Sequence, residues 1–312
     1  MKTSLKTVLA AVAVIGSLTL AGCAPAAEEP AATAEAAALE GLTGVVGAKD
    51  FSEQYILGNM VSLLLNENGA DTSYQTIVGS ANVRTALESD EFMGYWEYTG
   101  TSWLAYNGND AGIPGVQAQY DAVKAADAAK GIAWLDGANV NNTYAFAIRS
   151  EKAAELGIKS LSDIAALPAA EQTFCVESEF ASRPDGWEGL KKAYGLTGAK
   201  TVTLDTGAIY SVADAGKDCN FGEVFATDGR IKALDLTVMA DDKEYFPVYQ
   251  VGFTLKQSTL DAYPALADII NKLTATLTDT VMQGLNARAD VDGDDPEDIA
   301  REYLVEQGLI KG

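Results

Sequence analysis

Residues 94–101 read Gly-Tyr-Trp-Glu-Tyr-Thr-Gly-Thr and bring three large aromatic side chains together just before a turn that carries two hydroxyl groups. If this segment is an extended strand, Trp96 and Tyr98 lie on one face, because side chains alternate along a strand. Tyr95 and Glu97 then lie on the other face. Ligand sites of open α/β domains lie at the carboxyl ends of strands. The stretch therefore predicts either rings and donors at the edge of a site, or core aromatics followed by an ordinary turn.

Expected strands and helices alternate around this stretch, and the alternation restarts beyond residue 142. Apolar residues recur at helical spacing in 51–68, and Asp50 with Glu53 is expected to cap the start of that helix. The acidic run 290–298 has Asp295, not glycine, at the sixth position that an EF-hand calcium loop requires, and is interpreted as the capped start of the last helix. The pattern predicts an α/β fold with two units. Expected strands are 44–48, 73–78, 132–135, 143–149, 173–177, 201–204, 221–226, 233–238 and 248–255; expected helices are 51–68, 83–87, 117–129, 162–167, 185–194, 207–215 and three at the end of the chain.

The chain has 312 residues, enough for one large domain or two medium ones. Its 22 Lys and Arg against 44 Asp and Glu give a formal charge of −22, which repels nucleic acid and anionic membrane surfaces. The sequence contains no histidine. This excludes Ser-His-Asp and Cys-His catalysis, His-ligated zinc and a histidine proton shuttle. We therefore expect neither nucleic-acid binding nor imidazole chemistry.

Residues 1–22 have the pattern of an export signal peptide. Two lysines precede an apolar run at 8–20, which is too short for a membrane span. The ending Leu-Ala-Gly-Cys resembles the lipobox of bacterial lipoproteins, in which the cysteine, here Cys23, is lipidated and becomes the first mature residue. An ordinary secretory signal cut elsewhere is the alternative. Residues 23–42 contain almost nothing to bury and are expected to form a flexible tether.

Cys175 and Cys219 are the two other cysteines. Each lies in a short apolar run that is expected to be a strand, and an even number of cysteines in an exported chain favours a disulfide. Two buried free thiols are the alternative. Neither cysteine has a basic neighbour that would make it a reactive thiolate, so the pair is expected to serve stability.

Four stretches, taken in order along the chain, resemble the substrate-binding proteins of bacterial ABC importers for glycine betaine, choline and related osmoprotectants. They are Gly-Ala-Lys-Asp-Phe-Ser-Glu-Gln-Tyr-Ile-Leu-Gly at 47–58, Tyr-Trp-Glu-Tyr-Thr-Gly-Thr at 95–101, Glu-Phe-Ala-Ser-Arg-Pro-Asp-Gly at 179–186 and Tyr-Phe-Pro-Val-Tyr at 245–249. The closing Glu-Gln-Gly-Leu-Ile at 306–310 is also similar to that family. No single stretch is specific by itself, but their combination and order are.

The resemblance covers about residues 43–312 and implies a two-lobed α/β periplasmic-binding-protein fold, similar to type II, with two crossover strands and a ligand cleft between the lobes. Lobe 1 would comprise residues 43–142 and 249–312, and lobe 2 residues 143–248. A ligand in the cleft would touch both lobes and so bind the closed form preferentially. Binding and closure would then be one equilibrium.

A trimethylammonium group has no N–H to donate, and aromatic faces bind it by offering a negative quadrupole together with apolar contact. By resemblance, Asn142 would contribute its backbone carbonyl near this group. One departure from the family pattern is visible: Phe225 stands where a tyrosine is expected, so the ring face is kept and a hydroxyl is lost. The rings that the resemblance assigns to the cage are Tyr98, Tyr144, Phe225 and Tyr249.

The same resemblance places Lys49, Thr101 and Arg183 at the carboxylate end of such a ligand, where charge-assisted donors are needed. Arg183 also precedes Pro184 at the expected opening of a helix, where an anion would meet the positive end of the helix dipole. Each of these residues has a simpler interpretation as well: a solvated lysine, a turn residue, and a surface arginine paired with Asp185. Phe225 and Tyr249 would, in that case, be core rings.

The sequence thus predicts a monomeric, lipid-anchored extracytoplasmic binding protein. It would capture a quaternary ammonium osmolyte with a carboxylate, such as glycine betaine or proline betaine, and deliver it to a membrane ABC permease. Catalytic residues, cofactors and metals are not expected. Choline, carnitine or another betaine are alternative ligands, of which the larger ones would need a larger cleft. An exported enzyme and a structural surface lipoprotein are alternatives from different classes.

Overall fold

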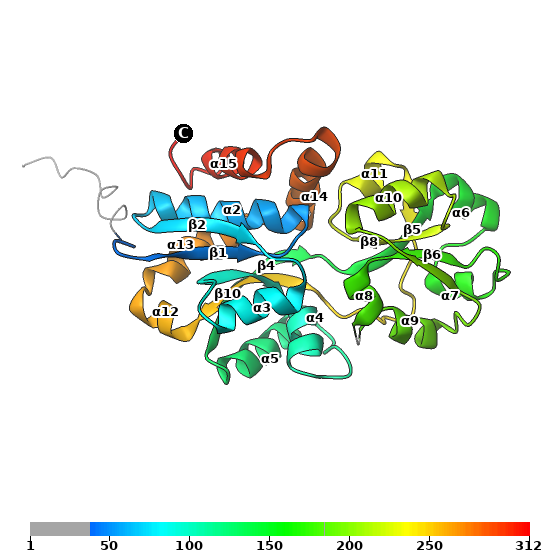
Figure 1. Ribbon diagram of the computed structural model, residues 1–312, viewed down its shortest axis with the longest axis horizontal. Coiled ribbons are helices and arrows are strands. Elements are labelled where there is room, and N and C mark those ends of the chain that lie inside the picture. Colours follow the sequence, from blue (N-terminus) through cyan, green and yellow to red (C-terminus); the bar gives the residue numbers. More distant parts are fainter. Residues whose placement is uncertain (1–37, 184) are drawn as a thin grey trace, which may run out of the picture.

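The computed structural model describes residues 38–183 and 185–312. The predicted signal peptide 1–22, the lipidation site Cys23 and most of the tether 23–42 lie outside the described residues. The described chain forms two five-stranded sheets, set side by side and flanked by helices (Figure 1). This is the α/β architecture that the sequence predicts. None of the helices in the described ranges combines the length and the apolar character that a membrane span requires.

The first sheet joins strands from both ends of the described chain. In spatial order they are β2 (Asp71–Thr76), β1 (Thr43–Ala48), β3 (Gly94–Tyr98), β10 (Gln250–Lys256) and β4 (Ile132–Asn141). Strand β1 runs parallel to β2 and β3, whereas β10 runs antiparallel to β3 and β4. The last part of the chain therefore completes the sheet that the first part begins.

Helices cover both faces of this sheet. Those that share the larger core on one face are α2 (Ser52–Glu67), α13 (Ala265–Thr274), α14 (Asp279–Ala287) and α15 (Pro296–Glu306). The helices α3 (Ser80–Glu88) and α5 (Val116–Ala128) pack on the other face. Four α-helices follow β10, where the sequence predicts three, because α12 (Gln257–Ala262) is an additional short one. The last helix starts as predicted, with Asp295 accepting a hydrogen bond from the backbone N–H of Glu297.

The second sheet takes its strands from the middle of the chain. In spatial order they are β7 (Lys200–Thr203), β6 (Thr173–Val176), β8 (Phe221–Phe225), β5 (Tyr144–Arg149) and β9 (Leu236–Val238). Helices that the sequence predicts on its faces are α7 (Leu161–Ala165), α9 (Trp187–Tyr194) and α10 (Thr206–Ala215). Helices that it does not predict are the short α6 (Ser150–Leu156), α8 (Ser178–Ser182) and α11 (Arg230–Ala233).

Two links connect the sheets. The chain passes from β4 to β5 through residues 142–143 and returns from β9 to β10 along residues 239–249. We call the first sheet with its helices lobe 1 and the second lobe 2; Figure 1 shows them left and right. The lobe limits predicted from the sequence, between 142 and 143 and between 248 and 249, fall in these links and stay predictions.

The aromatic stretch that follows Gly94 forms β3, and its side chains alternate as predicted. Trp96 and Tyr98 belong to the core shared with α2, whereas Tyr95 belongs to the core on the α3 face. The strand is followed by the short helix α4 (Thr99–Thr101) and not by a simple turn. A Cβ atom at Gly100 would lie 2.6 Å from the ring of Tyr249. Glycine at this position therefore lets that ring pack directly against the backbone.

The start of α2 differs from the prediction. Its N-cap residue is Phe51, and no side chain caps the helix. Asp50 instead accepts a hydrogen bond of 3.2 Å from the backbone N–H of Gly79, and Glu53 is buried. A capping pair satisfies the local backbone only. Both carboxylates are used here for contacts with distant segments, which the local pattern does not reveal.

The folded body begins earlier than the predicted end of the tether. Leu39 and Leu42 are buried in the core that contains α2. The backbone N–H of Leu39 donates to the carbonyl of Asn68, just past the end of α2. The prediction that residues 23–42 form a tether is therefore wrong for 39–42. Two leucines are enough to dock this segment, since each buried leucine stabilises a fold by about 1.5–3 kcal/mol.

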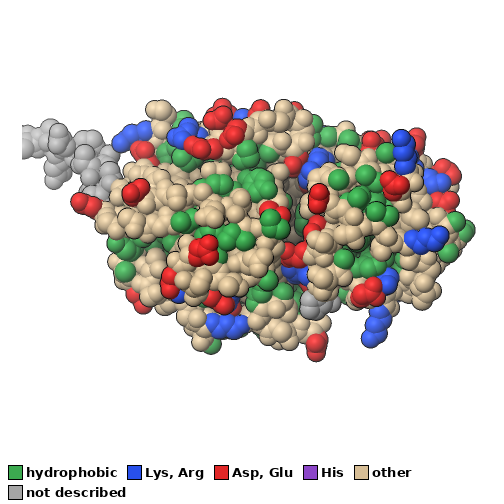
Figure 2. Space-filling model, viewed as in Figure 1, with side chains coloured by type: hydrophobic (Ala, Val, Ile, Leu, Met, Phe, Trp, Pro, Cys, Tyr) green, Lys and Arg blue, Asp and Glu red, His purple; other side chains and the backbone are tan. Residues whose placement is uncertain are grey.

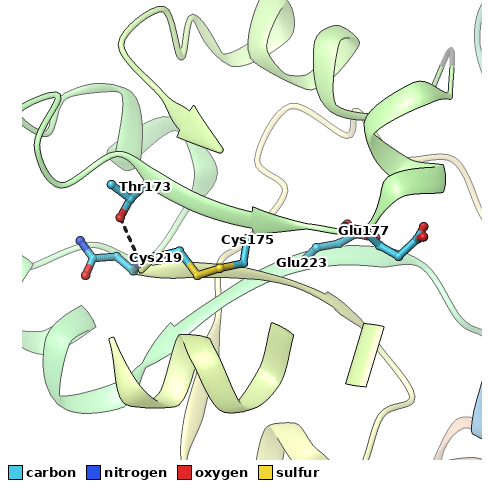
Figure 3. The surroundings of a disulfide bond; sticks show 6 residues. Thr173, Cys175, Glu177, Cys219 and Glu223 are labelled. Carbon is cyan, nitrogen blue, oxygen red and sulfur yellow. Dashed lines mark hydrogen bonds between the residues drawn. A yellow bond between two sulfur atoms is a disulfide. The ribbon is translucent and has the colours of Figure 1, made fainter. Parts of the chain in front are cut away.

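A disulfide joins Cys175 in β6 to Cys219 just before β8 (Figure 3). Both cysteines are buried, and because their sulfur atoms are bonded to each other the alternative of two free thiols does not hold. The neighbouring backbone N–H of Asn220 donates to the hydroxyl of Thr173 at 2.9 Å, drawn as a dashed line in Figure 3. The bridge therefore ties two neighbouring strands of lobe 2.

Candidate ligand-binding site

A cavity of about 430 Å³ lies between the two lobes. Its walls come from the carboxyl ends of β1 and β3, from the start of β10 and, across the cleft, from β5, α8 and β8. Charged side chains gather along the boundary between the lobes in Figure 2. The cavity brings together all the residues that the sequence nominates for ligand binding, namely Lys49, Tyr98, Thr101, Asn142, Tyr144, Arg183, Phe225 and Tyr249. Their contact with a ligand stays a prediction.

The aromatic rings of the cavity form one cluster. The ring centroid of Tyr144 is 5.3 Å from that of Phe225 and 5.3 Å from that of Tyr249. Phe51, which the sequence analysis did not nominate, stacks on Phe225 at 5.4 Å and approaches Tyr98 at 6.3 Å. Rings from both lobes therefore meet at the cleft. Because each ring face is electronegative, such a cluster can hold a cation that has no hydrogen-bond donors.

The ring of Tyr98 is held by its hydroxyl, which accepts a hydrogen bond of 3.0 Å from the amide of Gln54 and donates one to Glu53. Glu53 lies in the first turn of α2 and is 2% exposed. Burial raises the pKa of Glu53, and its hydrogen bonds lower it in part. Its two oxygens accept from four side chains: Tyr98 at 2.7 Å, Asn142 at 2.9 Å, Thr227 at 2.5 Å and Asn286 at 3.1 Å.

Lys49 follows β1 and is buried against β3. Its Nζ lies 2.5 Å from Oε1 of Glu97 and 5.0 Å from the ring centroid of Tyr98. Glu97 also accepts a hydrogen bond of 2.8 Å from the hydroxyl of Tyr95. The interpretation of Lys49 as a solvated lysine is wrong, because its side chain is 4% exposed. The ammonium group has three N–H donors, so its pairing with Glu97 leaves donors that can reach a ligand.

Arg183 is also buried among carboxylates. Its guanidinium group makes a two-pronged contact with Asp185, at 2.8 and 2.6 Å, and donates to Glu179 at 3.1 Å. Its Cζ lies 5.7 Å from the ring centroid of Tyr144. The pairing with Asp185 matches the simpler interpretation, but the pair is buried and not at the surface. The expected place at a helix opening is wrong, since Arg183 ends α8 and α9 begins at Trp187.

Asn142 and Thr101 also line the cavity. The side-chain amide of Asn142 donates to Glu53, and its Oδ1 is buried with no hydrogen-bond partner among the described residues. The backbone N–H of Asn142 donates to the carbonyl of Tyr249 at 3.2 Å. Thr101 lies in α4, is 4% exposed and lines the cavity. Both residues are thus at the cavity, as expected, but Asn142 has a structural contact that the sequence does not indicate.

Glu223 is a buried acid of lobe 2, and among the described residues no cation makes a hydrogen bond to it. Glu223 in β8 is 3% exposed, and one oxygen accepts the backbone N–H of Glu177 at 2.8 Å. Among the described residues its other oxygen has no hydrogen-bond partner. Burial raises the pKa of Glu223 well above the ordinary glutamate value, so the protonated form is favoured. Figure 3 shows Glu223 beside Glu177 and near the disulfide.

Several residues of the site escape sequence reasoning. Phe51, Glu53 and Glu97 all lie inside stretches that carry the family resemblance, but the sequence predicts no binding role for them, and only a capping role for Glu53. Glu179 lines the cavity from lobe 2 and accepts a hydrogen bond of 2.9 Å from the backbone N–H of Ser80 in lobe 1. Glu179 opens the stretch 179–186, so membership of those stretches was the available signal for all four residues. The contact of Glu179 joins segments 99 residues apart and has no local signature.

The fold and the cleft define a two-lobed solute-binding protein. The family model described as the substrate-binding domain of ABC-type glycine betaine transport systems matches residues 44–306. The chain belongs to this family. A solved structure described as a glycine betaine/carnitine/choline ABC transporter shares its fold, with a TM-score of 0.71 and 27% sequence identity. The match covers 85% of this chain and 99% of that one.

Two curated relatives name different ligands. A glycine-betaine-binding protein of Pseudomonas aeruginosa is 36% identical over 85% of this chain and 88% of its own length. The ergothioneine transport permease/ergothioneine binding protein EgtU of Helicobacter pylori is 34% identical over 85% of this chain. The match spans 48% of EgtU. The relatives are substrate-binding proteins of transporters, and this chain is a substrate-binding protein of the same kind.

Proposed function

We propose that this protein binds a small zwitterion with a quaternary ammonium group and a carboxylate, such as glycine betaine or proline betaine. The observation that carries the proposal is the ring cluster around a cavity that also contains Lys49 and Arg183. The rings would receive the ammonium group and the two cations the carboxylate. The glycine-betaine-binding relative supports the same ligand class.

The ring cluster can supply much of the binding free energy. A favourable cation–π contact contributes about 0.5–2 kcal/mol, so a few rings together contribute several kcal/mol. Very small ligands gain at most about 1.5 kcal/mol per non-hydrogen atom, and glycine betaine has roughly eight such atoms. The rings therefore account for a large share of the affinity that such a ligand can reach.

The carboxylate of the ligand would bind donors that the site does not use internally. Among the described residues, Arg183 uses three of its five N–H donors, for Asp185 and Glu179. Lys49 uses one of its three for Glu97. Choline carries a hydroxyl in place of the carboxylate and would leave these charged donors without an anionic partner. We therefore expect glycine betaine to bind more tightly than choline.

A larger betaine is the second candidate, because of the cavity volume. Cavities that enclose drug-sized ligands measure about 300–1,000 Å³, and the 430 Å³ measured here falls in that range. This is more room than glycine betaine needs. Carnitine or a histidine-derived betaine would fill it further while keeping the same two charged ends. The relative named for ergothioneine supports including such ligands in the first binding experiment.

The remaining parts of the proposal concern the cell. The protein would be exported through residues 1–22, lipidated at Cys23 and held as a monomer at the membrane, outside the cytoplasm. There it would present its closed, loaded form to an ABC permease. Mass spectrometry of the protein extracted from membranes would test the lipid, which is expected on a mature chain that begins at Cys23.

Isothermal titration calorimetry tests the ligand. We expect glycine betaine or a larger betaine to bind, and Arg183→Ala and Tyr249→Ala both to weaken binding. Choline binding that exceeds betaine binding and does not depend on Arg183 would contradict the carboxylate part of the proposal and leave the ring part. Absence of binding for every quaternary ammonium ligand would contradict both.

A further inference from the structure

We propose that Glu53 is the anionic counterpart of the ligand's ammonium group and that it acts through Tyr98. This inference rests on the proposed function, because it concerns the same cavity and a cationic ligand. Glu53 itself does not line the main cavity, whereas Tyr98 does. The carboxylate lies behind the ring, so it is a positioning residue for the ring that would contact the ligand.

The surroundings of Glu53 match an ionised carboxylate. The amide of Asn286 that faces it also donates to the backbone carbonyl of Thr227 at 3.0 Å, so this side of the amide is the donor side. The amide of Asn142 and the hydroxyls of Thr227 and Tyr98 fill the other acceptor positions. An ionised carboxylate only accepts hydrogen bonds and can accept four of them.

Four neutral groups thus hold the charge of Glu53 without cancelling it. Other carboxylates at the cleft are balanced directly: Glu97 pairs with Lys49, and Asp185 pairs with Arg183. Asp185 also accepts from the hydroxyl of Tyr249 at 2.5 Å, which gives a second ring with a carboxylate behind it. The difference is that Arg183 already compensates Asp185. Among the described residues no cation forms an ion pair with Glu53, so the charge behind Tyr98 is available to a ligand.

The hydrogen bond from Tyr98 to Glu53 makes the ring a better cation receptor. A phenol that donates to a carboxylate acquires part of the character of a phenolate, and the extra electron density spreads into the ring. The face of the ring becomes more negative, which strengthens cation–π attraction. The ring also shields the carboxylate, so the ammonium group need not strip water from it. Lys49 Nζ, paired with Glu97, lies 5.0 Å from the Tyr98 centroid, so an ammonium group can be placed within cation–π distance of this ring.

Glu53 also links this receptor to lobe closure. Thr227 follows β8 in lobe 2, while Tyr98 and Asn286 belong to lobe 1, so the carboxylate bonds to both lobes at once. A small cavity behind the ring cluster is lined by Glu53, Thr227 and Asn286 together. Tyr98 donates to one oxygen of Glu53 and Thr227 to the other, so the carboxylate also contributes to holding the two lobes together.

The test compares two ligands of the same shape. Glycine betaine and 3,3-dimethylbutanoate differ only in that carbon replaces the charged nitrogen. Calorimetry and competition on the full chain would give both affinities for the wild type, Glu53→Gln, Tyr98→Phe and the double variant. We expect Glu53→Gln to weaken glycine betaine about tenfold, within the range of one cation–π contact, and the carbon analogue less than about twofold. In the Tyr98→Phe background, Glu53→Gln should have a smaller effect.

Thr227→Val is the matched control, because it removes the lobe 2 donor and leaves the charge. It should weaken both ligands by the same factor. Equal losses of both ligands in Glu53→Gln, or independent effects of Glu53→Gln and Tyr98→Phe, would overturn the inference and leave the proposed function intact. A wild type that binds neither ligand would overturn both. If Glu53→Gln does not fold, Tyr98→Phe decides alone: an unchanged ratio between the two ligands overturns the inference.

Discussion

The two lobes build their walls of the cleft in different ways. On the lobe 1 wall, Lys49 finds its carboxylate partner in the neighbouring strand, at Glu97. On the lobe 2 wall, Asp185 accepts from the hydroxyl of Tyr249, and Glu179 accepts from the backbone of Ser80. Tyr249 and Ser80 both lie with lobe 1. Arg183 pairs with Asp185 and Glu179 inside lobe 2, as Lys49 pairs with Glu97 inside lobe 1. The difference is that both lobe 2 carboxylates also accept from the lobe 1 side, whereas on the lobe 1 side it is Glu53, behind the wall, that accepts from Thr227 of lobe 2.

This difference indicates how binding and closure are coupled. A wall whose ion pair is satisfied internally keeps its shape when the lobes separate. A wall whose acceptors receive hydrogen bonds from the opposite lobe has those bonds only in the closed form. These hydrogen bonds therefore favour closure. We infer that the lobe 1 part of the site is preformed and that lobe 2 completes the site when the lobes close.

Breaking the lobe 2 wall at Arg183 should have the largest effect. Arg183→Ala leaves Asp185 and Glu179 without their cation in a buried place, which costs about 3–5 kcal/mol of unfolding free energy. Chemical denaturation measures this. Arg301→Ala is the matched control, because Arg301 pairs with Glu297 at the surface, where a pair contributes about 0–1 kcal/mol. Similar losses in both variants would contradict the buried role of Arg183.

Removing the disulfide should destabilise lobe 2 more than lobe 1, since both cysteines lie in lobe 2. The Cys175→Ala/Cys219→Ala variant removes a link across 44 residues, and we expect a loss of about 2–4 kcal/mol. Hydrogen exchange should show faster opening in β6 and β8 than in the strands of lobe 1. Equal loss of protection in β1 and β3 would mean that the lobes unfold as one unit.

Weakening the cross-lobe bond of Glu179 should reduce affinity more than stability. Burial raises the pKa of this carboxyl, but the charge of Lys49 and the N–H of Ser80 outweigh it, so the pKa lies below the ordinary value. Glu179→Gln replaces an ionised acceptor by a neutral one, and we expect roughly fivefold to tenfold weaker ligand binding by calorimetry. Glu188→Gln, whose carboxylate is exposed, is the control. An unchanged affinity in Glu179→Gln would contradict the idea that lobe 2 is completed by lobe 1.

The smallest expected effect is a pH dependence at Glu223. Its raised pKa means that the folded chain keeps a proton that the unfolded chain releases, so this residue lowers stability as the pH rises from the ordinary glutamate value through the folded pKa. Glu223→Gln should equal the wild type near pH 4 and become the more stable protein toward pH 7. Unfolding free energies at several pH values measure this, with Glu151→Gln, at an exposed position, as the matched control. A pH-independent difference would contradict the raised pKa.

Much of the architecture follows from local patterns. The alternation of strands and helices predicts both sheets, and the period of two in β3 places Trp96 and Tyr98 on one face. The errors concern contacts between distant segments. Glu53 has the spacing of a capping residue, yet its partners lie 45 to 233 residues away. Likewise, nothing local shows that Leu39 docks beside the end of α2.

The site was predictable to the extent that its members stand in recognisable stretches. Those stretches identify the rings and the two cations that line the cavity. They do not reveal that Lys49 and Arg183 each hold a carboxylate of their own, because a linear pattern carries no information about which charges become neighbours after folding. Which charged side chains pair depends on how the elements pack together, and the sequence pattern does not show this packing.

The docking of Leu39 also fixes the point on the folded body to which the preceding chain is joined. Helix α2 starts at the cleft with Glu53 and ends beside Leu39, and its 16 residues span about 24 Å. A surface or a fluorescent label attached ahead of Leu39 would therefore sit one helix length away from the mouth of the cleft. Immobilisation through this end leaves the approach of solute unobstructed, which makes the chain suitable as the recognition element of a biosensor.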